Sequence, residues 1–450
     1  MGAVAATKLP PVIDRDAAWL AGAAGGRVVL HENGGSGPAR AVVDSREIQA
    51  GDLFVGLPGT QADGGRFAAA ALDAGAWGVL VDEQHAEGLS GGTVIAAADP
   101  LAALQELARA WRRELGAKVA GVTGSTGKTS TKDILAALLS TRLRTHRNRE
   151  NLNTEIGLPL SLLAAPPDTE ALVLEMAMRG EGQIAELTAI AEPDVGVIVN
   201  VGPVHLELLG TVERVAAAKA ELIRDLRPGA ACVVPANEPL LEAHLREDLD
   251  TWTFGPGGQV SLVSLENGVA EIEARGEPVR LELPYSEQHN LLNTLAAVAA
   301  AMALGVTPGG AVEVSFSSLR GEVVELPGGV TVVNDCYNAN PMSMRAALEH
   351  LAETPAERRI AVLGTMAELG AEAPAYHREV GELAAERGID ALITVGHEAL
   401  AYTEGFDGET HPVATPEEAG ELLRELAHPG DRVLVKGSRS VGLERVLAGA

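Results

Sequence analysis

The segment Thr123–Ser130 joins an apolar run to a stretch with helical spacing, and it combines two glycines with a lysine and several hydroxyl side chains. Such glycines let backbone N–H groups turn inward around phosphate oxygens, and the N-terminus of the following helix adds positive potential. Lys128 can reach the outer phosphates, and the Thr129 hydroxyl can bind Mg²⁺. Val122 stands where the full pattern has glycine, so the match covers its second half. We therefore predict a nucleotide-binding loop, with an ordinary glycine-rich turn as the alternative. The expected phosphate contacts are Gly124, Ser125, Thr126, Gly127, Lys128, Thr129 and Ser130.

Two polar side chains follow predicted buried strands. Glu175 follows the apolar residues 171–174, and His205 follows 195–201. Residues just past the ends of parallel strands gather on the carboxyl edge of a sheet, where the loop also lies. Both side chains could be Mg²⁺ ligands, although a neutral histidine is an unusual ligand for so hard a cation. Each alone could be an ordinary strand-end polar residue, and their shared edge favours function.

Lys219 lies in the middle of a predicted apolar helix face. The helix is expected to begin after Thr211 as its N-cap and to run over 212–226, with Lys219 four residues after Val215 and three before Leu222. A buried ammonium is costly unless it is paired or chemically altered. The alternative is a lysine that snorkels past the edge of the stripe. The solvent side of this helix is expected to carry Arg214, Glu221 and Asp225.

The elements that must position these residues alternate between buried strands and helices, which predicts an α/β fold with mainly parallel sheets. Strands are expected at 118–123, 171–174, 195–201, 330–333, 360–363, 391–395 and 432–435, and helices at 101–115, 212–226, 343–351 and 377–387. We expect three domains: a small N-terminal α/β domain (1–114), a central P-loop parallel-sheet ATPase domain (115–312) and a C-terminal Rossmann-like α/β domain (313–450).

Composition limits the class of protein. At about 150 residues per domain, 450 residues with 46% hydrophobic side chains indicate several cores. The 35 Lys and Arg against 62 Asp and Glu give a net charge of −27, which repels phosphate backbones and disfavours nucleic-acid binding. Two cysteines are too few for a disulfide framework, and the N-terminus lacks a signal peptide's apolar core. The most apolar stretch, 295–304, is about half of a membrane span. We expect a cytoplasmic protein without membrane insertion.

Taken in order, the motifs resemble the Mur ligases of peptidoglycan synthesis, and within them the branch that adds D-alanyl-D-alanine. The resemblance covers nearly the whole chain. Besides the loop, it rests on Asp44–Arg46, Gly51–Val55, Asn151–Asn153, Leu174–Met176, His205–Glu207, Ala218–Glu221, His289–Asn290, Tyr337–Pro341, Met366–Gly370 and Lys436–Arg439.

The resemblance implies an ATP-dependent amide ligase that joins D-alanyl-D-alanine to UDP-N-acetylmuramoyl-tripeptide. The tripeptide carboxylate would attack the γ-phosphate to give an acyl phosphate, and the dipeptide amine would then displace phosphate. ADP and phosphate would be released, and we expect a monomer. The alternatives are another ATP-dependent Mur-type or folylpolyglutamate-type ligase, or a non-catalytic nucleotide-binding regulator.

The resemblance also assigns roles to residues. Lys128, Glu175, His205 and Lys219 would be catalytic, with Thr129, Glu175, His205 and a Lys219 carbamylated by CO₂ around two Mg²⁺ ions. The expected ligand contacts are Ser45 and Arg46 with uridine, Asn293 with adenine, Arg320 with the γ-phosphate, Asp335 with ribose, Asn338 and Asn340 with the dipeptide, and Asn151 and Asn153 with substrate. The chain departs from the pattern at Ala177, Ala220, Glu287, Leu319, Asn334, Cys336 and Thr365. None of these departures removes a proposed metal ligand.

Overall fold

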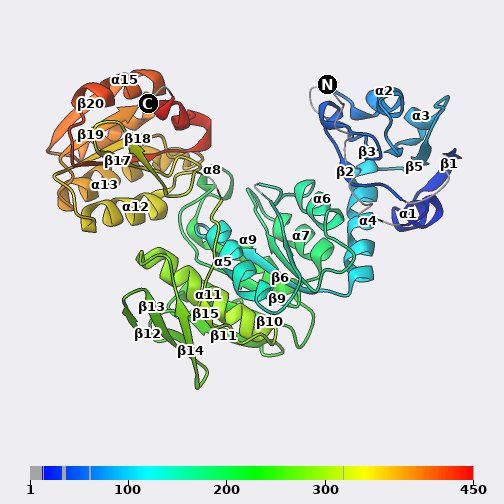
Figure 1. Ribbon diagram of the computed structural model, residues 1–450, viewed down its shortest axis with the longest axis horizontal. Helices are drawn as coiled ribbons and strands as arrows, with labels where there is room; N and C mark the ends of the chain where they lie inside the picture. Colours follow the sequence, from blue (N-terminus) through cyan, green and yellow to red (C-terminus); the bar gives the residue numbers. More distant parts are fainter. Residues whose placement is uncertain are drawn as a thin grey trace, which may run out of the picture.

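The computed structural model describes residues 13, 15–32, 37–59, 62–149, 151–317 and 319–448. The N-terminal segment on which the absence of a signal peptide was argued lies outside these residues. Three β-sheets surrounded by helices form three bodies, and the N-terminal (blue) and C-terminal (orange and red) bodies stand apart on either side of the central one (Figure 1). The expected three-domain α/β fold is confirmed. In the described part of the chain, no helix has both the length and the apolarity needed to cross a bilayer.

The first sheet has five strands, all parallel to their neighbours except for the β1–β5 pair. Its order is β1 (Arg27–His31), β5 (Thr93–Ala96), β4 (Gly78–Val81), β3 (Leu53–Val55) and β2 (Ala41–Val42), with helices α1 (Ala17–Ala23), α2 (Ala68–Asp73), α3 (Glu83–Ala86) and α4 (Pro100–Leu115). Asp99 caps α4 by accepting hydrogen bonds from the N–H groups of Leu101 and Ala102. This long helix leads from the first sheet to the second (Figure 1).

The second sheet has ten strands and carries the predicted nucleotide-binding loop. Its order is β15 (Gly310–Ala311), β14 (Glu277–Glu282), β13 (Val269–Ala274), β12 (Val260–Glu266), β11 (Asp250–Phe254), β10 (Ala231–Pro235), β9 (Val195–Ile198), β6 (Lys118–Thr123), β8 (Ala171–Glu175) and β7 (Thr145–Arg147). The helices are α5 (Lys128–Ser140), α6 (Gly157–Leu163), α7 (Gln183–Ala191), α8 (Leu206–Leu209), α9 (Val212–Asp225), α10 (Pro239–Glu242) and α11 (Gln288–Ala303). The strands from β7 to β12 are parallel, as expected, whereas β12, β13 and β14 form an antiparallel meander that the sequence analysis did not predict.

Strands β8, β6 and β9 bring the chemistry to one edge of this sheet. Val122 of β6 is in register with Glu175, and Thr123 with Ile198. Because the strands are parallel, their carboxyl ends meet where the loop after Thr123 begins. Strand β9 ends at Ile198 rather than at Val201, because the following residues leave the ladder to contact that loop.

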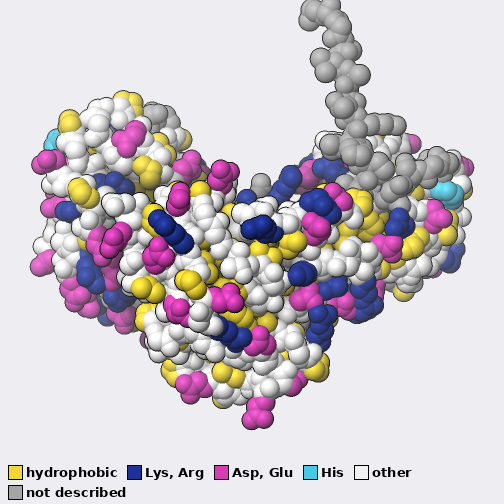
Figure 2. Space-filling view, turned by 60° about the horizontal axis from the view of Figure 1, so that its bottom comes forward, with side chains coloured by type: hydrophobic (Ala, Val, Ile, Leu, Met, Phe, Trp, Pro, Cys, Tyr) yellow, Lys and Arg dark blue, Asp and Glu magenta, His cyan; other side chains and the backbone are white. Residues whose placement is uncertain are grey.

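The third sheet has six strands, all parallel to their neighbours except for the β16–β17 pair. Its order is β16 (Glu322–Leu326), β17 (Val330–Asn334), β21 (Asp431–Lys436), β18 (Arg358–Gly364), β19 (Ala391–Val395) and β20 (Glu409–Val413), with helices α12 (Pro341–Glu353), α13 (Ala373–Glu386), α14 (Ala401–Glu404) and α15 (Pro416–Leu426). The four strands predicted here are confirmed. Acidic and basic side chains are interspersed over the face of the molecule in Figure 2, so the net negative charge is not gathered there in one patch.

One prediction for helix α9, that Glu221 faces solvent, is wrong. Glu221, expected on the solvent side, is buried: its carboxylate accepts hydrogen bonds from the N–H groups of Gly182 at 2.6 Å and Ala185 at 3.0 Å. These groups belong to the N-terminus of α7, whose N-cap, Gly182, has no side chain to accept them. A carboxylate from a neighbouring helix therefore replaces the missing cap.

Glu221→Ala should lower the free energy of unfolding by about 1–2 kcal/mol, because it leaves two N–H groups at the start of α7 without an acceptor. Chemical denaturation of the variant and of Glu213→Ala, an exposed glutamate on the same helix, measures the difference. A stability of Glu221→Ala equal to that of the unmodified protein would show that the cap contributes nothing.

Candidate active site

The loop after β6 has the backbone that a phosphate site requires. Gly124 has a φ of 159° and Gly127 a φ of 73°, and a Cβ at Gly127 would collide with the amide oxygen of Asn293. Gly127 is the N-cap of α5, so the helix begins directly at Lys128 with its first N–H groups facing the loop. The strand, loop and helix order predicted for Thr123–Ser130 is confirmed.

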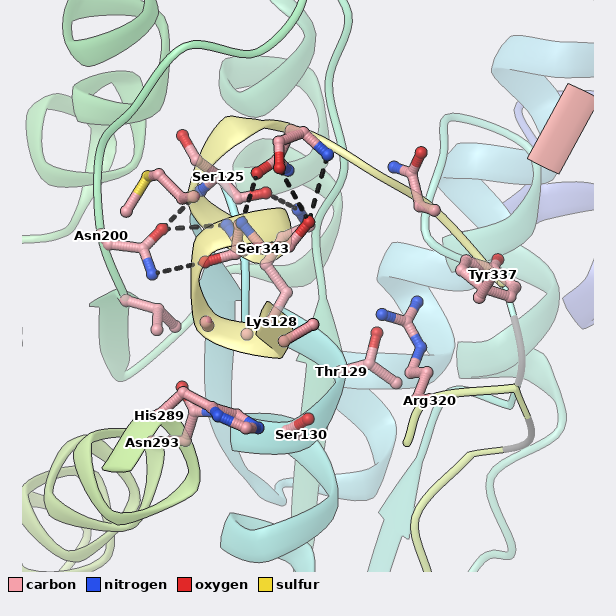
Figure 3. A pocket seen from close by; sticks show the side chains of 18 of the residues that line it. Ser125, Lys128, Thr129, Ser130, Asn200, His289, Asn293, Arg320, Tyr337 and Ser343 are labelled. Carbon is pink, nitrogen blue, oxygen red and sulfur yellow. Dashed lines mark hydrogen bonds between the residues drawn. The ribbon is translucent and has the colours of Figure 1, made fainter. Parts of the chain in front are cut away.

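Asn200 holds this loop in shape, and the sequence analysis missed it. Its Oδ1 accepts hydrogen bonds from the N–H groups of Ser125 at 3.1 Å and Thr126 at 2.9 Å, and its Nδ2 donates to Thr126 Oγ1 (Figure 3). Ser125 Oγ also donates to the carbonyl of Gly202. The sequence signal for Asn200 was its position just beyond the end of β9, on the same sheet edge as the loop.

Lys128 bends back over the loop that precedes it. Its Nζ donates to the carbonyl oxygens of Gly124 at 2.7 Å and Ser125 at 3.3 Å. Desolvation lowers the pKa of Lys128, and the positive charge of Arg320 lowers it further, against the opposing effect of Glu175. The ammonium therefore gains electrostatically from a nearby anion, such as a phosphate group.

Glu175, the last residue of β8, anchors a set of hydrogen bonds across the sheet edge. Its Oε2 accepts from Thr129 Oγ1 at 2.7 Å, and its Oε1 accepts from Asn153 Nδ2 at 2.8 Å. The Asn148 side chain bonds both the N–H and the carbonyl of Glu175. The predicted pair of oxygen donors, Thr129 and Glu175, is thus in direct contact.

Lys132 adds a buried cation that sequence reasoning did not identify. It is 1% exposed, its Nζ lies 3.9 Å from Glu175 Oε2, and it donates to the carbonyl of Asn148 at 3.1 Å. Desolvation lowers the pKa of Lys132 to about 8, although Glu175 opposes the shift. Its position four residues after Lys128, on the same face of α5, was the available signal.

Lys219 is buried on α9, as its place in the apolar stripe predicts. The residue is only 2% exposed, which excludes the snorkelling alternative in this structure. Among the described residues, its Nζ has no hydrogen-bond or ion-pair partner. Desolvation lowers the pKa of Lys219 well below its usual value, and the nearby charge of Lys128 lowers it further. This environment favours the neutral amine over the ammonium.

His205 joins the central body to the third. It has a φ of 55°, and its Nδ1 lies 2.5 Å from Glu368 Oε2. Arg179 also pairs with Glu368, at 3.5 Å. The hydrogen bond from His205 lowers the pKa of Glu368, which therefore remains a carboxylate. The motif containing Glu368 was noted in the sequence, but its partner across the domain boundary was not.

The third sheet supplies the opposite wall. Lys436, 2% exposed, donates to Asp335 Oδ2 at 2.5 Å and to the carbonyl of Asn338 at 3.1 Å. Asn340 caps α12 by accepting from the N–H of Ser343, and the Ser343 hydroxyl accepts from the N–H of Asn340. This capping box gives Asn340 a structural role beside the expected ligand contact.

Most of these residues, but not Lys132, line one cavity of about 1410 Å³ between the central and third bodies. Of the predicted site residues, it brings together Ser125, Thr126, Gly127, Lys128, Thr129, Ser130, Asn151, Asn153, Glu175, His205, Lys219, Asn293, Arg320, Asp335, Asn338 and Asn340. Gly124, Ser45 and Arg46 do not line it. Gly124 is the first residue of the loop, whereas Ser45 and Arg46 lie in a short 3₁₀ helix of the first body, where Arg46 pairs with Asp44. Among the described residues, no three His, Cys, Asp or Glu side chains form a metal-binding group.

Comparison with known proteins identifies the family. The middle domain of Mur ligases matches residues 122–301, their glutamate ligase domain matches 319–439, and the Mur ligase family catalytic domain matches 42–112. The UDP-N-acetylmuramoyl-tripeptide–D-alanyl-D-alanine ligase of Bacillus subtilis is 36% identical over 90% of this chain and 91% of its own length. That of Synechocystis is 38% identical over 90% of both chains.

Solved structures agree. A MurF crystal structure from Acinetobacter baumannii matches with a TM-score of 0.87 at 28% identity, covering 98% of this chain and 99% of its own. The MurF ligase of Thermotoga maritima in complex with ADP matches with a TM-score of 0.79 at 34% identity, covering 91% and 96%. The sequence matches over nine-tenths of its length, and the fold matches over all three bodies. The chain therefore belongs to the Mur ligase family, in its MurF-type branch.

Proposed function

We propose that this protein is an ATP-dependent ligase that joins D-alanyl-D-alanine to UDP-N-acetylmuramoyl-tripeptide in peptidoglycan precursor synthesis. The observation that carries the proposal is the convergence of Lys128, Glu175 and Lys219 with third-domain residues in one cavity. Two relatives with the corresponding name are 36% and 38% identical over nearly the whole chain. We further propose that it acts as a monomer in the cytoplasm.

The division of labour follows the domain boundaries we propose, 1–114, 115–312 and 313–450. Ser45 and Arg46, in the first domain, contact the uridine end of the acceptor. In the central domain, the loop holds the phosphates, and Asn293 contacts the adenine. The third domain supplies Asp335 to the ribose and Asn338 and Asn340 to the dipeptide, while Arg320, at its start, contacts the γ-phosphate. Asn151 and Asn153 contact the acceptor.

The donor set fits Mg²⁺ on one side of the cavity. Glu175 and Thr129 offer oxygen atoms, which this hard cation prefers, and they are already in contact beside the loop. Lys219 fits a second ion only as a carbamate, which replaces an unpartnered amine by an oxygen ligand of negative charge, and His205 completes this set by its ring nitrogen. Bound Mg²⁺ neutralises the charge that develops during phosphoryl transfer.

The chain's own groups orient and activate the reactants. Lys128 and Arg320 place positive charge at the outer phosphates, so the tripeptide carboxylate can attack the γ-phosphorus. The bond to the β,γ-bridging oxygen breaks, ADP leaves, and an acyl phosphate forms. The dipeptide amine then attacks the acyl carbon, and phosphate leaves. Holding both reactants in a single cavity supplies much of the rate acceleration, because a free carboxylate is a poor acyl donor.

Phosphate release tests the function. With ATP, UDP-N-acetylmuramoyl-tripeptide and D-alanyl-D-alanine together, phosphate and a new amide product should form in equal amounts. Omission of either the tripeptide substrate or the dipeptide should abolish the formation of both. A screen of amines, including single amino acids and glutamate, distinguishes other Mur-type and folylpolyglutamate-type ligases. Nucleotide binding without turnover for any amine would favour a regulator instead.

Domain closure should accompany binding, because Asp335 and Lys436 of the third domain must meet a nucleotide held by the loop of the central domain. We expect the radius of gyration from small-angle scattering to decrease when nucleotide and acceptor are both saturating. ADP alone serves as the control for partial closure. An unchanged scattering curve with both ligands would contradict a site completed by domain movement.

A further inference from the structure

A buried carboxylate on α5 ties down the segment that connects the central and third domains. Asp133 Oδ2 accepts hydrogen bonds from Ser317 N at 3.0 Å and from Ser317 Oγ at 3.1 Å. Its Oδ1 pairs with Arg147 of β7 and lies 3.4 Å from Lys132 Nζ, and Arg147 also donates to the carbonyl of Ser315 at 3.4 Å. The Asp133 side chain is fully buried. We call this arrangement the Asp133 clamp. A buried carboxylate with this many donors holds its partners in fixed positions.

The clamped segment leads directly to Arg320. Leu319, where the family resemblance expects glycine, has a φ of 61°, a conformation that is unfavourable for a residue with a Cβ atom. Its carbonyl accepts from the N–H of Tyr337 at 3.2 Å, and the Arg320 guanidinium carbon lies 4.1 Å from the centre of the Tyr337 ring. Such a backbone persists only where its surroundings hold it. The Asp133 clamp holds it on the central side, and Tyr337 holds it on the other.

Arg320 lines the same cavity as the loop. Thr129 and Lys128 line this cavity too. The charge of Arg320 lowers the pKa of both Lys128 and Lys132, which places it within electrostatic reach of both ammonium groups. Within the described chain, its Nε is buried and has no hydrogen-bond partner.

We propose that Asp133 is a positioning residue for phosphoryl transfer: by clamping residues 315 and 317, it sets where Arg320 meets the γ-phosphate of ATP. The inference rests on the proposed function, in which Arg320 contacts that phosphate. In this proposal α5 has a second function besides phosphate binding. The same helix carries Lys128, which faces the nucleotide, and Asp133, which positions Arg320 of the third domain. The side chain of Asp133 itself does not touch the nucleotide.

Asp133→Asn tests this role. The substitution preserves the shape of the side chain but replaces one acceptor oxygen by an NH₂ group, which cannot accept the hydrogen bonds of the surrounding donors. Turnover should fall about tenfold, the loss expected for one charged hydrogen-bond contact. The affinity for β,γ-imido-ATP, measured by titration calorimetry, should fall by about the same factor, while the affinity for ADP changes less than about twofold. In an Arg320→Ala background, Asp133→Asn should cause no further loss, because both changes remove one contact.

Asp194→Asn is a matched control. Asp194 also accepts from a backbone N–H, that of Val119 at 2.7 Å, and pairs with Arg227, but it lies at the opposite end of β6. Any effect of this change should be the same with and without Arg320. The proposal fails if Asp133→Asn weakens the binding of ADP as much as the binding of imido-ATP. It also fails if the losses of turnover from Asp133→Asn and Arg320→Ala multiply in the double variant, because Asp133 then has only a structural role.

Ser317→Ala guards against a folding defect in Asp133→Asn. It removes only the Oγ hydrogen bond, so we expect a smaller loss with the same selectivity for imido-ATP over ADP, and unchanged binding of both nucleotides would overturn the proposal. The binding comparison needs no ligase activity. The two proposals can therefore fail separately. If the unmodified protein does not ligate, but Asp133→Asn still weakens the binding of imido-ATP more than that of ADP, the proposed reaction is wrong and the positioning role of Asp133 is retained.

Discussion

Lys128→Ala should reduce ligase turnover by about 10³-fold while leaving the fold intact. Among the described residues, the ammonium bonds only to carbonyl oxygens of its own loop, at Gly124 and Ser125, and its pKa is lowered by desolvation. Removing it therefore relieves a buried charge in the free protein but deletes the cation that stabilises the outer phosphates during transfer. Phosphate release under saturating substrates measures the loss, and thermal unfolding checks the fold.

Lys118→Ala provides the control for Lys128. Lys118 starts the same strand that leads into the loop, and its Nζ donates to the carbonyl of Leu304 at the far end of β6. Turnover in this variant should remain within about twofold of the unmodified protein, since no phosphate contact is removed. Unmodified turnover in Lys128→Ala would show that the loop is an ordinary turn.

Local sequence patterns were sufficient for the features that depend on neighbours along the chain. The apolar run before Thr123, the two glycines and the helical spacing after Lys128 predict strand, loop and helix because each depends on local backbone preferences. The apolar stripe that contains Lys219 likewise reports which side of α9 is buried. The parallel order of the strands then brings Glu175 to the loop.

Features that depend on distant contacts could not be predicted in the same way. Glu221 is polar and was placed toward solvent, yet it caps α7, whose approach the periodicity of α9 does not encode. Asn200 and Lys132 act through residues far away in sequence or on other strands. The contact between His205 and Glu368 spans two domains, and only the assembled fold brings its partners together. The antiparallel meander β12–β14 is different: β13 and β14 alternate buried and exposed side chains, which is the local pattern of half-buried strands, so these strands could have been predicted from the sequence.

Lys219→Ala should nearly abolish ligation, by about 10³-fold or more, while the protein stays folded. The unpartnered amine lies 2% exposed beside Lys128, so shortening it removes a desolvation cost together with some packing of the side-chain stem. A plain ammonium here would place a cation beside the proposed Mg²⁺ ions, where like charges repel strongly in a poorly solvated site. A carbamate reverses the sign: the neutral amine adds to CO₂ and releases a proton, which leaves a carboxylate-like ligand.

The lowered pKa of Lys219 favours this modification, because only the neutral amine reacts with CO₂ and the shift enlarges its share near neutral pH. Protein equilibrated with ¹³C-labelled bicarbonate should therefore give a carbamate carbon signal that is absent from Lys219→Ala. Lys219→Glu should recover activity only partly, because its carboxylate is shorter than a carbamylated lysine. Small acids such as acetate should restore part of the turnover of Lys219→Ala by filling the gap, and should leave Lys128→Ala inactive. Full turnover of Lys219→Ala without added acid would instead mean that the buried lysine has no part in the chemistry.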